Sequence, residues 1–341
     1  MRSVVLVGGF GTRLRPLTAS TPKQMLPLVD RPMIEWVLAG LARHGIDEAV
    51  LALGYRPEAF QRAYPDSVCA GVRLVYAVEP EPLDTAGAVG FAAAEAGIDE
   101  RFVVVNGDVL TDLDLSALLE LHEDAHRRLG AEGTIALHRV ADPSAFGVVP
   151  TDADGRVVAF VEKPPPGEAP TDLINAGTYI LEPSVLDRVE AGRRVSVERE
   201  VFPAMVADRT LFAHDDGGVY WIDTGTPAQY LDAMLDLVEG RRGYRPDAVS
   251  ATATVDPSAV VERSVVMAGA TVGAAAIVRN SALLPGASVA DGATVEDSVV
   301  GPGAEIGSGA GVIGGSVLGD GVVVEAGTVV DGQRIPDPEG A

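Results

Sequence analysis

Two lysines stand out among the residues that could do chemistry. The chain has 341 residues and 26 lysines and arginines together, of which only Lys23 and Lys163 are lysines. Lys23 follows the glycine-rich run GGFGTRLRPLT (residues 8–18), and Lys163 lies in FVEKP (residues 160–164). An ammonium group is a compact point charge and a guanidinium is a planar fork, so some phosphate sites need lysine. We therefore predict that both lysines bind phosphates. The alternative is that they are ordinary surface lysines beside the motifs.

The glycine-rich run follows an apolar segment and has the composition of an anion-binding turn. It is neither a P-loop, which requires GxxxxGK[ST], nor a dinucleotide-binding GxGxxG, because Leu14 occupies the last glycine position. Backbone amides in such a turn approach an anion closely, and Arg13 and Arg15 add guanidinium forks suited to bidentate phosphate contact. The amides expected to form this cradle belong to Gly8, Gly9, Gly11 and Thr12.

Composition excludes several classes of protein. The formal charge of −23 and the lack of a basic segment disfavour binding to nucleic acid or to anionic membranes. Cys69 is the only cysteine, so no intrachain disulfide framework is expected and a reducing compartment is favoured. The apolar run before Gly8 is too short for a signal peptide, and no stretch reaches the length of a membrane span. We expect a cytoplasmic protein of two domains.

The elements that must position these residues alternate between strands and helices up to about residue 240. This alternation predicts an α/β fold, a Rossmann-like doubly wound and mainly parallel sheet with helices on both faces. Such sheets bind ligands beyond the carboxyl ends of their strands, which brings residues 8–15 close to residues 106–108. The expected strands are 4–7, 49–53, 74–78, 102–105 and 134–139. The expected helices are 32–44, 86–96 and 114–128.

A six-residue apolar repeat begins near residue 249. It predicts a parallel β-helix in which small residues fill the positions between the repeated side chains. The expected divisions are a catalytic domain over residues 1–240, a linker over 241–248, the β-helix over 249–331 and a frayed tail over 332–341. The repeated residues are Val249, Val255, Val261, Val266, Val272, Val278, Leu284, Val289, Val295, Val300, Ile306, Val312, Leu318, Val324 and Val330.

The glycine-rich run with TPK (residues 21–23) resembles the signature of sugar-1-phosphate nucleotidylyltransferases. The resemblance continues in order through NGD (106–108), FGVV (146–149), FVEKP (160–164), INAG (174–177) and WIDTGTP (221–227). The hexapeptide repeat is similar to that of the branch of this family with a C-terminal left-handed β-helix. Within the family, SVEREVFPA (196–204) most resembles mannose-1-phosphate guanylyltransferases.

The resemblance implies a reaction and a role for each matching residue. A sugar-1-phosphate oxygen attacks the α-phosphorus of a nucleoside triphosphate, and pyrophosphate leaves. Asp108 and Asp223 would hold Mg²⁺, although either could instead be a turn or helix-capping aspartate. By the family's pattern Arg13 steadies the pyrophosphate, Lys23 the α-phosphate region and Lys163 the phosphate of the sugar.

The remaining implied contacts concern the sugar and the base. Glu79 stands where thymidylyltransferases have Gln, and a carboxylate suits the adjacent N1–H and 2-amino donors of guanine, which favours GTP. Asp84 replaces the family's usual Gly near the base, and Gln24 is more like the thymidylyltransferases. Residues expected to line the sugar are Gly147, Glu162, Asn175 and Gly177, and Gly107 is expected to contact the nucleotide. Gly177 could equally be required by its turn.

Several alternatives stay open at this stage. The substrate pair could be glucose 1-phosphate with dTTP, UTP or ATP, or a carbasugar 1-phosphate of secondary metabolism. A non-catalytic regulatory subunit that binds sugar nucleotides is a further alternative. Hexapeptide β-helices also host acyltransferases, but no histidine or lysine follows His214, so the general base for that reaction is missing. We expect the β-helix to be an oligomerisation surface that makes a homo-oligomer.

Overall fold

The computed structural model describes residues 1–54 and 56–337 and divides into two compact units. The first unit combines Met1–Gly9 with Ile34–Trp221, and the second combines Phe10–Met33 with the chain from Ile222 onward. The glycine-rich run is therefore split, because Gly8 and Gly9 belong to the first unit and Gly11 to Arg15 belong to the second.

A ten-stranded mixed sheet forms the centre of the first unit. Its parallel core has the order β7-β1-β4-β6, in which Val4 pairs with Val50 on one side and Val104 on the other. These three valines are fully buried, because a parallel strand covered on both faces must be apolar throughout. The strands are β1 (Arg2–Leu6), β4 (Glu48–Leu53), β5 (Val68–Cys69), β6 (Val72–Val78), β7 (Phe102–Asn106), β9 (Gly133–Arg139), β10 (Gly147–Val148), β11 (Val161–Glu162), β12 (Leu173–Leu181) and β13 (Leu211–Asp215).

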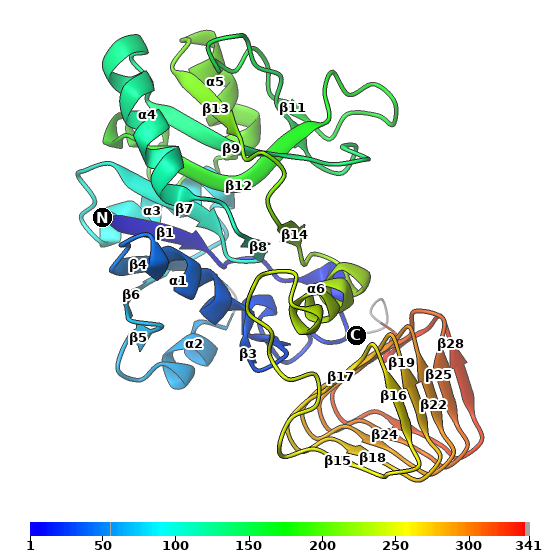
Figure 1. Cartoon of the computed structure of the whole chain (residues 1–341). Helices are drawn as coiled ribbons and strands as arrows, with labels where there is room; N and C mark the ends of the chain where they lie inside the picture. Colours follow the sequence, from blue (N-terminus) through cyan, green and yellow to red (C-terminus); the bar gives the residue numbers. More distant parts are fainter. Residues whose placement is uncertain (55, 338–341) are drawn as a thin grey trace. The chain divides into compact units, whose positions relative to one another are not determined.

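The doubly wound prediction is confirmed for the core of this sheet, and each expected strand and helix is found within about two residues of its predicted ends. Beyond β7 the sheet continues with β12, which runs antiparallel to both β7 and β9. Helix α3 packs on β1, β4 and β6, and α4 lies across β9 and β12 (Figure 1). The helices are α1 (Met33–Arg43), α2 (Pro57–Ala63), α3 (Asp84–Glu95), α4 (Leu115–Leu129) and α5 (Phe202–Ala207).

The second unit joins the glycine-rich loop to a helix and to the β-helix. Helix α6 (Pro227–Glu239) begins with Thr226, whose Oγ1 accepts a hydrogen bond from the Gln229 N–H at 3.3 Å, and ends at Gly240 with φ 79°. The buried Tyr230 of α6 donates its hydroxyl proton to the Pro27 carbonyl. The short elements are η1 (Thr12–Leu14), η2 (Lys23–Met25), β2 (Pro27–Leu28) and β3 (Arg31–Pro32). Strand β8 (Val109–Thr111) belongs to the first unit, and the boundary between the units falls within β14 (Trp221–Asp223).

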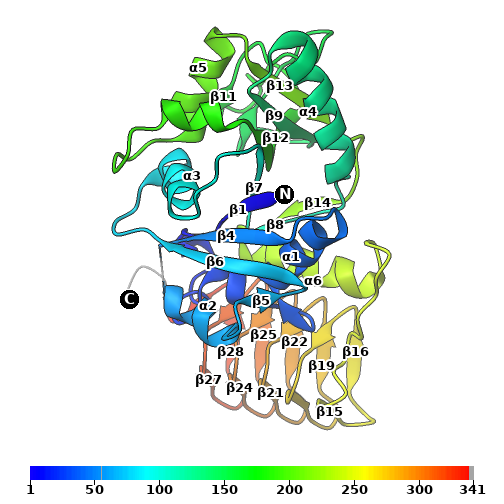
Figure 2. The same ribbon diagram turned by 90° about the vertical axis from the view of Figure 1, so that its left-hand side faces the viewer.

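Three five-stranded parallel sheets form the walls of the β-helix that the repeat predicts (Figure 2). Val255 pairs with Val272, which pairs with Val289, so each of these coils has 17 residues. The first wall has β15 (Thr254–Val255), β18 (Thr271–Val272), β21 (Ser288–Val289), β24 (Glu305–Ile306) and β27 (Val323–Val324). The second has β16 (Val260–Glu262), β19 (Ile277–Arg279), β22 (Thr294–Glu296), β25 (Gly311–Ile313) and β28 (Val329–Asp331). The third has β17 (Val265–Val266), β20 (Ala282–Leu283), β23 (Val299–Val300), β26 (Val317–Leu318) and β29 (Arg334–Ile335).

The structure differs from the expected β-helix in the position of one interior residue and in where the β-helix ends. A 17-residue coil has one wall of five residues, so Leu283 rather than Leu284 joins the interior with Val266 and Val300. Strand β29 pairs with β26 and so carries the β-helix into the range expected as a tail, whose last residues, 338–341, lie outside the described part. No helix in the described part of the chain is long and apolar enough to span a membrane.

Candidate active site

Arg13, Lys23 and Asp223 come together within the second unit. The Lys23 Nζ lies 3.7 Å from the Asp223 Oδ1, and the Lys23 side chain is only 6% exposed. A Cβ placed on Gly225 would lie 2.8 Å from the Arg13 Nη2 and 3.0 Å from the Asp223 Oδ2, so both groups flank this glycine. Residues about 200 positions apart in the chain thus form a cluster of two cations and one carboxylate, a combination that suits phosphate and a metal ion.

Gly11 shapes the loop that carries Arg13. It has φ 62°, and a Cβ there would lie 3.0 Å from the Thr18 Cγ2 and 3.2 Å from the Lys23 Cβ. The Thr18 Oγ1 donates a hydrogen bond to the Gly11 carbonyl at 2.8 Å, and the Leu14 N–H donates to the same oxygen at 2.9 Å. Only glycine satisfies both the left-handed backbone and the close approach of Lys23. Gly9, in the first unit, is exposed and has open space where a Cβ would be.

Glu79 lies in the first unit where β6 ends and beside the end of β1. Its Oε2 accepts a hydrogen bond from the Leu83 N–H at 2.9 Å, and its Oε1 would lie 3.2 Å from a Cβ on Gly8. Burial raises the pKa of the Glu79 carboxyl above its usual range, and the Leu83 N–H opposes this shift. The backbone thus holds one carboxylate oxygen in place and leaves the other directed toward Gly8.

Asp84 begins helix α3 in the left-handed conformation, with φ 62°. This backbone explains why glycine suits the position, and aspartate is among the residues that tolerate it. Its exposed side chain accepts a hydrogen bond from the Thr85 N–H at 2.9 Å. The next amides, of Ala86 and Gly87, donate to the Val195 carbonyl at 2.9 and 3.1 Å. The first turn of α3 is therefore tied to the segment before residue 196 through protein contacts.

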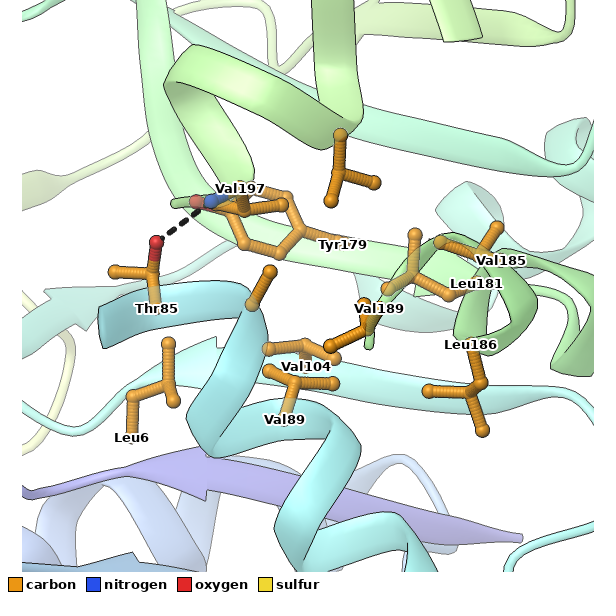
Figure 3. Close-up of a pocket in the computed structure, with 12 residues that line it drawn as sticks. Leu6, Thr85, Val89, Val104, Tyr179, Leu181, Val185, Leu186, Val189 and Val197 are labelled. Carbon is orange, nitrogen blue, oxygen red and sulfur yellow. Dashed lines mark hydrogen bonds between the residues drawn. The ribbon is translucent and has the colours of Figure 1, made fainter. Parts of the chain in front are cut away.

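An apolar pocket lies between α3 and β12 (Figure 3). The Thr85 Oγ1 accepts a hydrogen bond from the Val197 N–H at 2.8 Å, drawn in Figure 3, and donates to the Glu198 carboxylate at 2.8 Å. Apart from Thr85 and Tyr179, the lining is aliphatic: Leu6, Ala86, Val89, Val104, Leu181, Val185, Leu186, Val189, Val197 and Val201. Such a lining suits packing between α3 and η4 (Val197–Val201) and is unsuited to phosphate.

Gly107 and Asp108 follow β7 at the carboxyl end of the parallel core. A Cβ on Gly107 would lie 2.7 Å from the Val7 Cγ1 and 2.9 Å from the Leu6 carbonyl oxygen, so this position requires glycine. Asp108 is half-buried. The NGD motif is therefore packed directly on the end of β1, as its place after a core strand predicts.

Asn175 and Gly177 lie at a bulge in β12, between Asn175 and Tyr179. Gly177 has φ 76°, and a Cβ there would lie 2.6 Å from the Asn106 Nδ2. The Asn175 Oδ1 accepts from the Gly177 N–H at 3.0 Å, and the Asn175 Nδ2 donates to the Tyr179 hydroxyl at 2.8 Å. Gly177 is thus a backbone requirement that lets INAG approach NGD, and this close approach supports the second interpretation of that glycine.

Gly147, Glu162 and Lys163 occupy adjacent strands. Gly147 pairs with Glu162 across β10 and β11, and a Cβ on Gly147 would lie 2.6 Å from the Phe160 ring and 3.1 Å from the Glu162 Oε2. The Lys163 Nζ lies 3.4 Å from the Glu162 Oε1, and its side chain is 62% exposed. Lys163 also has a left-handed backbone, with φ 49°. Its ammonium group is therefore accessible to a ligand, in contrast to that of Lys23.

The sequence did not predict the contacts by which Trp221 holds these motifs together. The Trp221 Nε1 donates to the Ala176 carbonyl at 2.9 Å, and its ring stacks on His138 with centroids 5.2 Å apart. The His138 Nδ1 lies 2.8 Å from the Asp216 carboxylate, and the Phe146 ring meets Trp221 edge-on. These contacts fix the FGVV and INAG motifs together. The only sequence signal was that Trp221 opens its own motif.

The carboxylates of Asp108 and Asp223 are hard oxygen donors, which suit Mg²⁺ better than softer metals. Mg²⁺ is usually held by one or two carboxylates, with substrate phosphates and waters completing its shell. Asp223 already faces Lys23 and flanks Arg13, the groups expected to meet phosphate. The carboxylate of each aspartate, taken by itself, therefore suits a hard divalent cation.

Comparison with known proteins agrees with these features. Residues 2–240 match the family model described as nucleotidyl transferase, and residues 245–339 match the one described as GMPPB C-terminal domain. The mannose-1-phosphate guanylyltransferase of Mycobacterium tuberculosis is 44% identical over 268 residues, which cover 76% of this chain and 72% of that protein. The mannose-1-phosphate guanyltransferase of Schizosaccharomyces pombe is 39% identical over 277 residues, covering 77% and 74%. The chain therefore belongs to the nucleotidyl transferase family, as an enzyme whose catalytic fold is followed by a β-helix domain.

Proposed function

We propose that this enzyme transfers a guanylyl group from GTP to mannose 1-phosphate and releases pyrophosphate. The observation that carries the proposal is the cluster of Arg13, Lys23 and Asp223, which brings two cations of residues 8–23 to a carboxylate of the distant WIDTGTP motif. The names of the similar proteins from Mycobacterium tuberculosis and Schizosaccharomyces pombe support the choice of substrates.

The reaction makes one bond and breaks one. An oxygen of the sugar phosphate attacks the α-phosphorus, the bond from that phosphorus to the β-phosphate bridge breaks, and pyrophosphate carries away the electron pair. Arg13 stabilises the negative charge that develops on the pyrophosphate, and Lys23 stabilises the α-phosphate region. Asp108 and Asp223 would hold Mg²⁺, whose charge would help to neutralise the phosphates. The protein's own contribution is to position and orient the phosphates, since phosphoryl transfer needs little other chemistry.

Glu79 reads the base in this proposal. Guanine presents the N1–H and the 2-amino group side by side, and both are donors that a carboxylate accepts. The Leu83 N–H occupies Oε2 at 2.9 Å and fixes the orientation of the group, and Oε1 stays directed toward Gly8. A fixed acceptor favours GTP over dTTP and UTP, whose single N–H lies between two acceptors.

The sugar phosphate is bound by the motifs around β10 to β12. Glu162 accepts hydrogen bonds from sugar hydroxyls, Lys163 meets the phosphate of the sugar, and Asn175 with the backbone at Gly147 and Gly177 lines the ring. The exposed ammonium group of Lys163 and its proximity to Glu162 support this arrangement.

Two residues support a second pair of substrates as the alternative. Gln24 is 3% exposed, and it replaces the residue typical of guanylyltransferases beside Lys23. Asp84 adds an exposed negative charge near the base segment. These features favour dTTP, UTP or ATP with glucose 1-phosphate, or a carbasugar 1-phosphate, as the alternative.

The same proposal includes a homo-oligomer formed through the β-helix, in a cytoplasmic enzyme. The β-helix exposes Val323 and Val329, at 59% and 61%, on β27 and β28, the last strands of two of its walls. In this proposal a second copy of the chain would cover these side chains.

Pyrophosphate release tests the proposal. The enzyme is assayed with Mg²⁺ across GTP, ATP, UTP, CTP and dTTP against mannose 1-phosphate and glucose 1-phosphate. We expect the highest kcat/KM with GTP and mannose 1-phosphate. A maximum with another pair would refute the substrate assignment and keep the reaction class. Binding of GDP-mannose without turnover of any pair would favour the regulatory subunit.

A further inference from the structure

The loop that carries Arg13 is attached to the last coil of the β-helix. The Arg334 Nη1 donates a hydrogen bond to the Arg13 carbonyl oxygen at 2.9 Å. The Ser20 hydroxyl donates to the Asp320 carboxylate. A Cβ on Gly319 would lie 3.0 Å from the Pro16 Cβ, so the two backbones are in close contact there. All of these residues belong to the second unit.

The hydrogen bond from Arg334 to the Arg13 carbonyl joins the loop to another element, unlike the backbone hydrogen bonds inside the loop. The Leu14 N–H donates to the Gly11 carbonyl at 2.9 Å, and the Arg15 N–H donates to the Thr12 carbonyl at 3.2 Å. These local bonds define the shape of the turn and do not fix it to another element. The bond from Arg334 is the one described contact that ties the Arg13 peptide group itself to the β-helix.

The position of Arg334 is set by the coil beneath it. Strand β29 lies on β26 with Arg334 opposite Val317 and Ile335 opposite Leu318. The Gly319 N–H donates to the Ile335 carbonyl at 2.7 Å, which joins the coil to the turn that meets Pro16. The fold of the last coil therefore determines where the Arg334 guanidinium lies relative to the loop.

We propose that Arg334 is a positioning residue for the transfer reaction. By holding the Arg13 carbonyl it fixes the peptide from which the Arg13 guanidinium extends toward Gly225 and Asp223. This inference rests on the proposed role of Arg13 toward pyrophosphate. Catalysis of this kind depends on the geometry of charged groups, so a small displacement of the peptide reduces the rate. The β-helix is then part of the catalytic machinery through this contact, in addition to any role in assembly.

The test compares Arg334→Ala and Arg334→Lys with the control Arg279→Ala. Arg279 is also a surface arginine of the β-helix, and its partners are Glu262 and Glu296 on adjacent coils. The control removes one arginine and its two ion pairs and leaves the loop unchanged. Each full-length variant is measured for kcat, for the KM of the sugar phosphate, for the Kd of Mg²⁺–pyrophosphate by calorimetry, and for its melting temperature.

We expect Arg334→Ala to lower kcat roughly 10-fold and to weaken pyrophosphate binding by a similar factor. The KM of the sugar phosphate and the melting temperature should stay within the range of Arg279→Ala, and Arg334→Lys should restore part of the loss. Equal kcat and pyrophosphate binding in Arg334→Ala and Arg279→Ala would overturn the inference.

The titration with pyrophosphate distinguishes a failure of this inference from a failure of the proposed function. The pyrophosphate titration decides the role of Arg334 even in an enzyme that prefers another base or sugar, because pyrophosphate is common to all pairs. A wild-type protein that does not bind pyrophosphate would contradict both.

If Arg334→Ala does not fold, Gly319→Ala replaces it, since its Cβ would press on Pro16 and displace the same loop. Unchanged kcat and pyrophosphate binding in that variant would count against the inference.

Discussion

Replacing Glu79 by glutamine tests how the base is read. The Oε2 is held by the Leu83 N–H, so the oxygen of the glutamine amide would take that place and its NH2 would point toward Gly8. A donor would then face the donors of guanine. A mispaired buried polar group costs roughly 1–3 kcal/mol, which corresponds to a roughly 5- to 150-fold loss in kcat/KM for GTP. Because Glu79 is half-buried, we expect about 10-fold, with dTTP or UTP improving relative to GTP.

The pH dependence of this effect follows from the raised pKa of the Glu79 carboxyl. As the pH falls through that raised pKa, the carboxylate gains a proton, so the wild type loses its preference for GTP at a higher pH than an ordinary glutamate would. Glu79→Gln does not titrate, and its base preference should be flat over the same range. A raised pKa also means that the charged form destabilises the fold above it, so the variant should be at least as stable as the wild type at pH 7.

The assay is kcat/KM for GTP, UTP and dTTP between pH 5 and 8, with urea unfolding as the check on stability. Glu81→Gln is the matched control, because Glu81 is exposed two residues away and its substitution changes the net charge equally. The reasoning is refuted if Glu79→Gln keeps the wild-type base preference, or if Glu81→Gln shifts it as much.

The other predictions concern the metal, the turn at Gly177 and the charge at Asp84. Asp108→Asn and Asp223→Asn should each lower Mg²⁺-dependent kcat at least 100-fold while the protein stays folded, and near-normal rates in either would contradict the two-carboxylate assignment. Gly177→Ala should lower the free energy of unfolding by about 1–3 kcal/mol, because its φ is 76° and its Cβ would meet Asn106; a stability equal to the wild type in urea would contradict the strain. Asp84→Gly should lower the KM for GTP about 2-fold at low salt and less at high salt, and a salt-independent effect would rule out an electrostatic cause.

The sequence predicts the parallel core well, because its strands are continuous apolar runs bounded by glycine and polar residues. Val4, Val50 and Val104 are buried as expected of core strands, and helix α4 is capped by Asp114, the first residue of the expected helix. The antiparallel strand β12 was not expected, since its motif INAG contains a glycine and an asparagine that give no strand pattern. The hexad predicts the β-helix, but the five-residue wall that places Leu283 inside follows only from three-dimensional stacking.

The candidate site, like the fold, is predicted only in part by the sequence. Motif resemblance names Arg13, Lys23 and Asp223, but no periodicity indicates that residues 200 positions apart share one cluster. Local geometry explains two departures from simple rules: Asp84 and Lys163 both adopt left-handed backbones that only tertiary contacts can fix. The attachment of Arg334 to the Arg13 carbonyl is equally invisible in sequence, because backbone acceptors leave no signal in residue type.

The most direct test of the central claim is a competition among nucleotides. The enzyme is incubated with Mg²⁺, mannose 1-phosphate and equal concentrations of GTP, ATP, UTP, CTP and dTTP, and the nucleotide sugars formed are separated by chromatography. We expect GDP-mannose as the main product, with an equimolar release of pyrophosphate. Predominance of another nucleotide sugar, or no product at all, would contradict the proposed function.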